Sequence, residues 1–519
     1  MVATSAGVRR GDRDGSVTST VTRVVVVGGG AAGLSAAVTA NAAGAAVTLV
    51  TDGPLGGDCT WHGCVPSKSL LEAAAAGVPA RQAVAHAEQV VQRLARGENE
   101  HALGGLGIDV RRARARLSSA PPAERGGPPR PVLHLGDGSV LTPGRGAVLA
   151  TGSRPRPPED VLDGVALPVG TVLTTTEGWL TAVGEHLDRS GPVVVVGGGA
   201  SGAELAQALA RLRAGGEHGV TLLERAGDLL PSLPGAGQVV AASLRADGVR
   251  VVIGADPAAL LAATTVRAVS PGASAPAALV LLTAGREPAL DVLGRGCGVS
   301  TSAAGIVVDA AMRTTAPGVW AAGDVCGLRP STHVAVATGR VAAASLLGLD
   351  AAFDVRWAPR VVYTDPEVAA VGTVPGGPGT RSVRVPLSRS DRAAAAAVPA
   401  GRVPRRGWVR GGFAQVWVQE HPTAGGGTLV GALVVAPHAG ELIGEVALVG
   451  RLGLSVQEWV GGHDGIGSVS AQHAYPTWSS LWGAVGDRLL GDRTLGGRSG
   501  LSSSPRPPGG PHGPAAPPR

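Results

Sequence analysis

Two glycine-rich turns, each preceded by a run of four valines, constrain the fold of this chain more than any other feature. The valine runs occupy residues 24–27 and 193–196, and each leads through the spacing G-x-G-x-x-G into an alanine-rich segment. The glycines are Gly28, Gly30 and Gly33 in the first copy and Gly197, Gly199 and Gly202 in the second. In a strand–turn–helix unit the first glycine of each copy allows the tight turn, the second allows a pyrophosphate to approach the backbone, and the third allows close helix packing. The two copies therefore predict an α/β chain that binds two dinucleotides, each with its pyrophosphate at a helix N-terminus.

The residue that ends the next strand of each unit indicates how the ribose is bound. Segment 220–224 ends in Glu224, whose carboxylate can accept a bond from a ribose 2′-hydroxyl and repel a 2′-phosphate. NADH is therefore favoured, while the neighbouring Arg225 could tolerate the phosphate of NADPH. In the first unit Thr51 stands where the acidic residue is expected, and Asp52 follows it. Asp52 or Thr51 could contact the ribose, or Asp52 could be an ordinary N-cap or turn residue.

Cys59 and Cys64 have four residues between them, and they stand after a Gly-Gly pair and directly before Val-Pro-Ser-Lys68. This pattern predicts a small strained disulfide at a helix start, where the partial positive charge stabilises a thiolate. Such a pair exchanges electrons easily, whereas a structural disulfide resists reduction. Lys68 is the only lysine in the chain, beside 44 arginines. An ammonium and a guanidinium are not interchangeable, so a single lysine next to the cysteines indicates that Lys68 has a chemical role there.

The composition limits the remaining possibilities. A chain of 519 residues can form two to four domains, and four cysteines exclude a disulfide-stapled secreted scaffold and favour a reducing cytoplasm. The sequence contains no apolar run of 18 residues, so we expect no membrane span. The net charge is +6, but its one arginine cluster, at 111–116, has no aromatic platform, so we expect no nucleic-acid partner. Residues 1–21 and 486–519 have compositions that predict disordered tails.

Several further signatures follow in a characteristic order. They are Ala-Thr-Gly-Ser-Arg-Pro at 150–155, Ala-Gly-Arg-Glu-Pro at 284–288, Ala-Gly-Asp-Val at 322–325, Tyr-Thr-Asp-Pro-Glu at 363–367 and Pro-His-Ala-Gly-Glu-Leu-Ile at 437–443. With the glycine turns and the cysteine pair, they make the chain resemble the class I pyridine nucleotide-disulfide oxidoreductases. This flavoprotein family includes dihydrolipoamide dehydrogenase, glutathione reductase and mercuric reductase.

The resemblance implies two Rossmann-like domains and a C-terminal α+β dimerisation domain. The FAD-binding domain would comprise 22–160 and 285–350, the NAD(P)-binding domain 161–284, and the dimerisation domain 351–485. The implied enzyme is a homodimer that uses FAD and NAD(P)H to reduce a small-molecule electron acceptor.

The resemblance also implies roles for individual residues. Asp324 would hold the flavin ribityl chain, and Lys68 and Glu204 would form the pair beside flavin N5. Cys64 would be the flavin-facing thiolate and Cys59 the interchange thiol that meets the substrate. Cofactor contacts are also implied for Thr151, Gly152 and Gly285.

The C-terminal region departs from the family pattern. Thiol-disulfide members have His-Pro-Thr and a following glutamate, whose histidine protonates the leaving thiol. Here Tyr475 takes the place of that histidine and Ser480 that of the glutamate, while His473 stands two residues earlier. Tyrosine is a poor base at neutral pH but can donate a proton or bind a metal–thiolate complex. The alternatives for His473 are a substitute base and an interface histidine.

This departure changes the expected acceptor. It disfavours dihydrolipoamide and glutathione and favours a metal ion or a quinone, as in the mercuric reductase-like branch. The adjacent cysteines that capture the metal in mercuric reductase are missing, and Cys297 and Cys326 stand singly, as buried fillers rather than metal ligands. Dihydrolipoamide dehydrogenase and a non-catalytic redox sensor remain the alternatives.

Two residues in the cysteine loop are unusual. Asp58 is expected to raise the pKa of the neighbouring Cys59 thiol. His62 could offset that charge, act as a local acid, or be an ordinary loop histidine.

Overall fold

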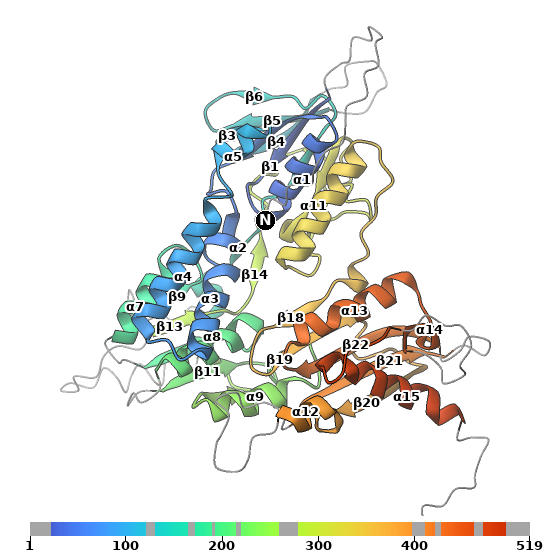
Figure 1. The fold of residues 1–519 in the computed structure, drawn as a ribbon. Coiled ribbons are helices and arrows are strands. Elements are labelled where there is room, and N and C mark those ends of the chain that lie inside the picture. The colour runs from blue at the N-terminus through green and yellow to red at the C-terminus, as the bar shows by residue number, and fades with distance from the viewer. Residues whose placement is uncertain are drawn as a thin grey trace, which may run out of the picture.

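Three α/β units, each built on a five-stranded sheet, make up the computed structural model of the protein (Figure 1). The structure describes residues 22–120, 130–163, 172–188, 192–213, 219–258, 279–396, 411–420, 427–460 and 471–494. The predicted tail at 1–21 and most of the tail at 486–519 therefore lie outside the described residues.

The first unit carries an entirely parallel sheet of order β17-β7-β1-β2-β3. Its strands are β1 (Arg23–Val27), β2 (Ala46–Thr51), β3 (Asp109–Arg112), β7 (Gly146–Leu149) and β17 (Val319–Ala321). The valines of β1 are buried because helices α1 (Ala31–Ala42) and α11 (Thr332–Leu346) pack together on one face of the sheet. The other face packs on an antiparallel sheet of β4 (Ala115–Ala120), β5 (Arg130–Leu135) and β6 (Val140–Leu141). Both faces are thus covered, as a parallel sheet requires.

The arginine cluster at 111–116 does not form one continuous strand. Arg111 and Arg112 end β3, Arg114 lies in the connection, and Arg116 is in β4. Three of its members form surface ion pairs, Arg111 with Asp109, Arg112 with Glu100, and Arg114 with Asp52. These pairs neutralise much of the positive charge that the sequence concentrates there.

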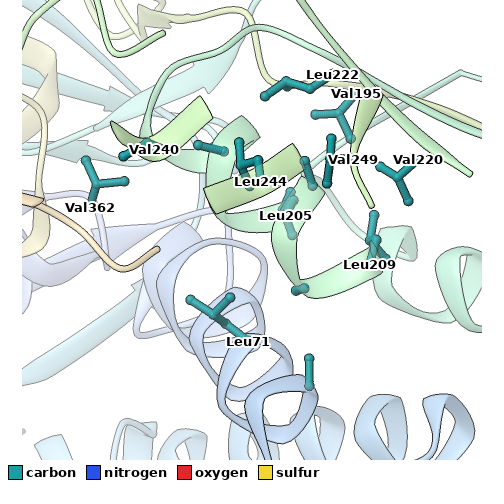
Figure 2. Close-up of a cluster of buried hydrophobic side chains, with 14 of the residues drawn as sticks. Leu71, Val195, Leu205, Leu209, Val220, Leu222, Val240, Leu244, Val249 and Val362 are labelled. Atoms are coloured by element: carbon teal, nitrogen blue, oxygen red, sulfur yellow. The ribbon is translucent and has the colours of Figure 1, made fainter. Parts of the chain in front are cut away.

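The second unit carries a parallel sheet of order β12-β11-β10-β13-β9. Its elements are β9 (Val172–Thr174), α7 (Trp179–Asp188), β10 (Val193–Val196), α8 (Ala200–Leu212), β11 (Val220–Glu224), α9 (Gly237–Ala246), β12 (Arg250–Ile253) and β13 (Leu279–Leu282). Figure 2 shows part of the core of this unit, which includes Leu205 and Leu209 of α8 together with Leu71 of α3 (Cys64–Ala75). Helices α3 and α4 (Ala80–Ala95) belong to the N-terminal segment, so this core joins the first two units.

The third unit carries an antiparallel sheet of order β18-β19-β22-β21-β20. Its elements are β18 (Arg360–Val362), β19 (Glu367–Gly372), β20 (Thr380–Pro386), α12 (Asp391–Ala396), β21 (Phe413–Gln419), β22 (Thr428–Ala436), α13 (Ala439–Leu452), α14 (Val456–Val460) and α15 (Leu481–Thr494). Helices α13 and α15 share one apolar core with the sheet. Helix α15 extends beyond residue 486, where the sequence predicts a disordered tail. It remains helical because Leu481, Val485 and Leu489, spaced four residues apart, are all buried in this core.

The remaining elements are short connections. They are α2 (Gly57–Trp61), α5 (Glu100–Gly105), β8 (Ser153–Pro155), α6 (Pro158–Val161), β14 (Arg286–Pro288), β15 (Thr301–Ser302), β16 (Gly305–Ile306) and the 3₁₀ turns Gly323–Cys326, Val355–Trp357, Leu387–Arg389 and Trp478–Ser480. In the part of the chain that the structure describes, no helix has the length and apolar character needed to cross a membrane.

Candidate active site

The cysteine loop packs directly on the first glycine turn. Gly56 N donates a hydrogen bond to Gly29 O at 2.9 Å, and a Cβ added to Gly57 would lie 2.7 Å from Gly30 Cα. Both Gly56 and Gly57 have positive φ, which favours glycine. The Gly-Gly pair therefore brings the cysteines to the mouth of the predicted dinucleotide site.

The two cysteines lie on consecutive helices as free thiols, so the disulfide that the sequence predicts is not formed in this structure. Cys59 is in α2, and Cys64 is the first residue of α3, as the predicted helix start requires. Thr332, the first residue of α11, donates from its hydroxyl to Cys59 Sγ at 2.9 Å, and the same hydroxyl oxygen lies 3.4 Å from Cys64 Sγ. Thr332 thus joins the pair from a helix more than 260 residues away in sequence.

The two thiols have opposite pKa shifts. The pKa of Cys64 is lowered to about 6, first by the hydrogen bond from Cys59 and also by Thr332 and Lys68, against the opposing effect of burial. The pKa of Cys59 is raised, first by its bond to Cys64 and then by burial. Cys64 is therefore the thiolate at neutral pH, and Cys59 retains its proton.

Asp58 does not act on the pKa of Cys59 in the way that the sequence predicts. Its carboxylate forms an ion pair with Arg286 at 2.9 Å, so the charge next to Cys59 is compensated. Burial raises the pKa of Asp58, while Arg286 and His62 lower it. The raised pKa of Cys59 thus follows from Cys64 and burial rather than from Asp58.

Lys68 and Glu204 form a close ion pair between the first two units. Lys68 Nζ lies 2.6 Å from Glu204 Oε2, and the side chains are 32% and 2% exposed. Burial disfavours the charged form of Lys68, but Glu204 outweighs it and raises the pKa. The pair forms because α3 and α8 pack through the core of Figure 2. The other oxygen of Glu204 accepts from the backbone N–H of Tyr363 at 2.9 Å.

A cavity of about 770 Å³ extends from the first glycine turn to the cysteine pair. It is lined by Gly28, Gly30, Asp52, Cys59, Cys64, Lys68, Thr151, Gly152, Arg286 and Asp324, among others. Its volume is within the usual range for a cofactor pocket.

The glycines of the turn fit a dinucleotide. A Cβ at Gly28 would lie 2.1 Å from Ala150 O, and one at Gly33 would lie 1.8 Å from Gly28 O, so both positions require glycine. Gly30, the N-cap of α1, has only Gly57 Cα, at 3.9 Å, near its missing Cβ. The helix N-terminus is thus open to the cavity, as binding of the FAD pyrophosphate requires.

A chain of polar contacts runs along one wall of this cavity. The hydroxyl of Ser153 donates to Asp324 Oδ2 at 2.8 Å, and Arg286 Nε donates to Ser153 Oγ at 2.8 Å. Arg286 also pairs with Asp58 beside the cysteines. Asp324 is therefore held in place, and no donor to its other carboxylate oxygen is found among the described residues, which fits a ribityl hydroxyl there.

Three other residues predicted to contact the cofactor, Asp52, Thr151 and Gly152, line the cavity, whereas Gly285 does not. Asp52 lines it but is 59% exposed and paired with Arg114 at 3.1 Å. The hydroxyl of Thr151 donates to Ala289 O at 2.7 Å, while Gly152 and Gly285 both have positive φ. These contacts fix the backbone where the chain leaves and re-enters the first unit.

The second glycine turn repeats the geometry of the first. A Cβ at Gly202 would lie 1.8 Å from Gly197 O, whereas Gly199 has no atom within 4 Å of its missing Cβ. Glu224 accepts from the backbone N–H groups of Gly198 at 2.5 Å and Ala226 at 2.7 Å. Its carboxylate is thereby fixed at the turn.

Arg225 points to acidic neighbours rather than to the turn. Its guanidinium lies 3.3 Å from Asp163 and 4.0 Å from Asp256. These carboxylates compete with any phosphate for the guanidinium.

The C-terminal loop does not join the site of its own chain. Tyr475 is 75% exposed and does not line the cavity. His473 Nε2 lies 2.9 and 3.0 Å from the two oxygens of Glu445, which also accepts from Trp459 Nε1 at 2.7 Å. His473 is thus held within the third unit.

The structure also places His62, Cys297 and Cys326, the other residues considered from the sequence. His62 lines the cavity between the cysteines, and its backbone carbonyl accepts from Trp179 Nε1 at 2.9 Å. Cys297 and Cys326 are buried in the apolar core of the first unit, where burial raises the pKa of Cys326 to about 12. Among the described residues, no three His, Cys, Asp or Glu side chains come together as a metal site.

Two glycine turns, a cysteine pair and a cavity that extends from the first turn to that pair define a redox enzyme that uses two dinucleotides. A model of the pyridine nucleotide-disulphide oxidoreductase family matches residues 22–339, and the chain belongs to this family. Its members are FAD-dependent enzymes that use NAD(P)H and act as homodimers on small-molecule substrates.

The similar proteins include two kinds of enzyme. The chain is 34% identical to a mercuric reductase of Acidithiobacillus ferrooxidans, over 84% of the chain and 78% of that protein. It is 28% identical to a dihydrolipoyl dehydrogenase of Geobacillus stearothermophilus, over 87% and 95% of the two chains. Among solved structures, LpdA of Mycobacterium tuberculosis matches with a TM-score of 0.71 and 25% identity, over 91% of this chain and all of that one.

Three residues of the site were missed by sequence reasoning. Thr332 follows no recognisable pattern, because its contact depends on how α11 meets the cysteine loop. Arg286 and Tyr363 each stand inside a signature of the family, and that position was the available signal.

Proposed function

We propose that this protein passes two electrons from NADH, through FAD, to the Cys59–Cys64 pair and from there to a metal ion. The observation that carries the choice of acceptor is the C-terminal loop. Tyr475 is exposed where thiol-disulfide members have a histidine, and His473 is bonded to Glu445. Exchange with a dithiol needs a group that takes and returns thiol protons. Electron transfer to a metal ion needs only the release of the thiol protons.

The proposed domain layout follows the sheets. Residues 22–160 and 285–350 would bind FAD, and 161–284 would bind NADH, because each of these units has a parallel sheet with a glycine turn. Residues 351–485 would form the dimer interface. The separation of the C-terminal loop from the cavity of its own chain supports a contribution of that loop across the dimer.

FAD, when bound, supplies the ring that accepts the hydride and delivers two electrons to the cysteines. The chain's own residues would hold and tune this site. Asp324 would accept from the ribityl chain, and the Lys68–Glu204 pair would lie beside the ring. Cys64, with a pKa of about 6, would face the ring as the thiolate, while Cys59 would meet the acceptor.

NADH is the proposed donor because Glu224 disfavours a 2′-phosphate and Arg225, which could tolerate one, is engaged by other carboxylates. The carboxylate of Glu224, fixed by Gly198 and Ala226, would accept the ribose 2′-hydroxyl and repel a phosphate. The guanidinium of Arg225 is shared with Asp163 and Asp256.

The proposed overall reaction with a divalent ion balances without a proton donor. The dithiol and Hg(II) would give the disulfide, Hg(0) and two released protons, so two electrons leave the sulfurs as the S–S bond forms. The relation to mercuric reductases supports this acceptor class. Because the sequence has no adjacent cysteines, Cys59 itself would take the ion from its soluble thiol complex.

Dihydrolipoamide dehydrogenase is the second candidate, favoured by relatives that the chain matches over nearly their whole length. In that case His473 or water would replace the missing base.

Steady-state NADH oxidation by the purified protein separates these candidates. The assay compares Hg(II) with excess thiol, a quinone and oxidised lipoamide, with Cys59→Ser as the matched control. We expect turnover with Hg(II) that Cys59→Ser abolishes. Fast lipoamide turnover instead would favour the second candidate, and a single reduction without turnover of any acceptor would indicate a redox sensor.

A further inference from the structure

The only lysine of the chain lies against one of its two tyrosines. Lys68 Nζ is 5.2 Å from the centre of the Tyr363 ring. The same tyrosine donates its backbone N–H to Glu204 Oε1 at 2.9 Å, while Lys68 contacts Oε2 at 2.6 Å. Tyr363 therefore contacts both members of the pair, from the third unit of the fold.

The segment that carries Tyr363 is clamped to helix α8. Asp365 N donates to Gln207 Oε1 at 2.8 Å, and Gln207 Nε2 donates back to Asp365 O at 3.1 Å. Gln207 is fully buried and stands one helical turn after Glu204. One helix thus holds both the carboxylate and the segment that bonds to it, so their relative position is fixed.

The ring is also confined on the side of α13. A Cβ added to Gly440, near the start of that helix, would lie 3.9 Å from Tyr363 Cε1. Gly440 N in turn donates to Glu367 Oε2 at 2.9 Å, which fixes the start of α13 against β19. The ring therefore occupies a defined place between Lys68 and α13, although 43% of the residue is exposed.

We propose that Tyr363 is a positioning residue that holds the Lys68 ammonium against Glu204 and beside Cys64. The ring attracts the ammonium through its negative face, and this attraction is strongest where water is excluded. About two thirds of the Lys68 side chain is shielded from solvent. The backbone N–H of Tyr363 holds the carboxylate at the same time, so a single residue of the third unit orients both charges.

The test compares variants at position 363 that keep an aromatic ring with variants that lose it. Tyr363→Phe and Tyr363→Trp retain the ring, whereas Tyr363→Leu and Tyr363→Met retain apolar volume without it. Each keeps the backbone N–H to Glu204, so the series isolates the ring. All four are made in the full-length, FAD-loaded protein, and FAD content and far-ultraviolet circular dichroism verify folding.

The first measurement reports the charge of Lys68 at Cys64 without any turnover. In a Cys59→Ser background, the long-wavelength thiolate–flavin absorbance is titrated with pH. Lys68 is one of the causes that lower the pKa of Cys64. Loss of the ring is expected to raise the titration midpoint by about 0.5 pH unit in the Leu and Met variants. The Phe and Trp variants should keep the midpoint of the parent.

The second measurement is the rate constant of flavin reduction by NADH in stopped flow, with Cys59 intact. The Leu and Met variants should be about three- to thirtyfold slower, which corresponds to the range of a cation–π contact. The Phe variant should retain at least half of the native rate.

The outcomes separate this inference from the proposed function on which it rests. Leu and Met variants that match the parent in both measurements would overturn the positioning role of Tyr363 and leave the proposed function intact. A Phe variant with the same shifts in midpoint and rate as the Leu variant would show that the hydroxyl matters rather than the ring. This result would also refute the proposed positioning role of the ring. A parent without any thiolate–flavin absorbance would refute the flavin-facing role of Cys64, and this inference with it.

Discussion

Replacing Lys68 by methionine removes the positive partner of a buried carboxylate. Glu204 is 2% exposed and receives the ammonium at 2.6 Å, with the backbone N–H of Tyr363 as its other donor. Loss of one member of a buried ion pair costs about 3–5 kcal/mol, because the remaining charge is left without compensation. Lys68 is one third exposed, so water can partly replace it, and we expect about 3 kcal/mol, the lower end of that range.

The matched control is the double variant Lys68→Met with Glu204→Gln. It removes both charges, and the glutamine carbonyl can still accept from Tyr363. We expect it to lose less than about 1 kcal/mol, because replacing both partners of a buried pair is often nearly neutral. Both variants should reduce flavin slowly with NADH, since neither has the ammonium.

Urea unfolding followed by circular dichroism measures the free energy difference between the two variants. Thermal unfolding should show the same order, with a shift of about 1 °C for each kcal/mol, because the unfolding entropy of about 2.1 cal/mol/K per residue is large for a chain of 519 residues. If the single variant is as stable as the double variant, the buried carboxylate does not depend on Lys68, and the argument fails.

Three further predictions concern the thiols, the nucleotide and the C-terminal loop. Two-electron reduction should give a long-wavelength thiolate–flavin band that grows as pH rises through about 6, the pKa of Cys64, and disappears below it. Cys64→Ser should abolish the band and Cys59→Ser should show it without reductant; a band in Cys64→Ser would reverse the assignment. Glu224→Ala should lower the preference in kcat/KM for NADH over NADPH at least tenfold, and a native protein that prefers NADPH would contradict this reading. Tyr475→His with Ser480→Glu should raise lipoamide turnover about a hundredfold or more while flavin reduction stays unchanged, and fast native turnover that the double variant does not improve would exclude it.

The features that the sequence predicted most reliably are those with local geometric requirements. Gly33 must be glycine because a Cβ would lie 1.8 Å from Gly28 O in the same turn. The start of α3 at Cys64 also agrees with the prediction. In contrast, the tail expected from residue 486 is partly helical. There the glycine- and arginine-rich composition was outweighed by Leu489, which the third unit buries.

The partners of the predicted residues were decided by the tertiary structure. Lys68 could be identified as chemically important from its isolation in the sequence, but its distance of 2.6 Å from Glu204 depends on the packing of α3 against α8. Asp58 was expected to act on Cys59, yet Arg286, 228 residues away, compensates its charge.

Sequence alone determined the two glycine turns, the cysteine pair and the family, because their spacing along the chain reflects steric and chemical needs within one loop. Only the fold decided that Thr332 bonds the cysteines, that Tyr363 contacts both Lys68 and Glu204, and that His473 is held by Glu445. These contacts join segments that are separate in the sequence, and such segments meet only when their apolar faces pack. Their geometry follows from burial of the shared cores, which no local pattern of residues records.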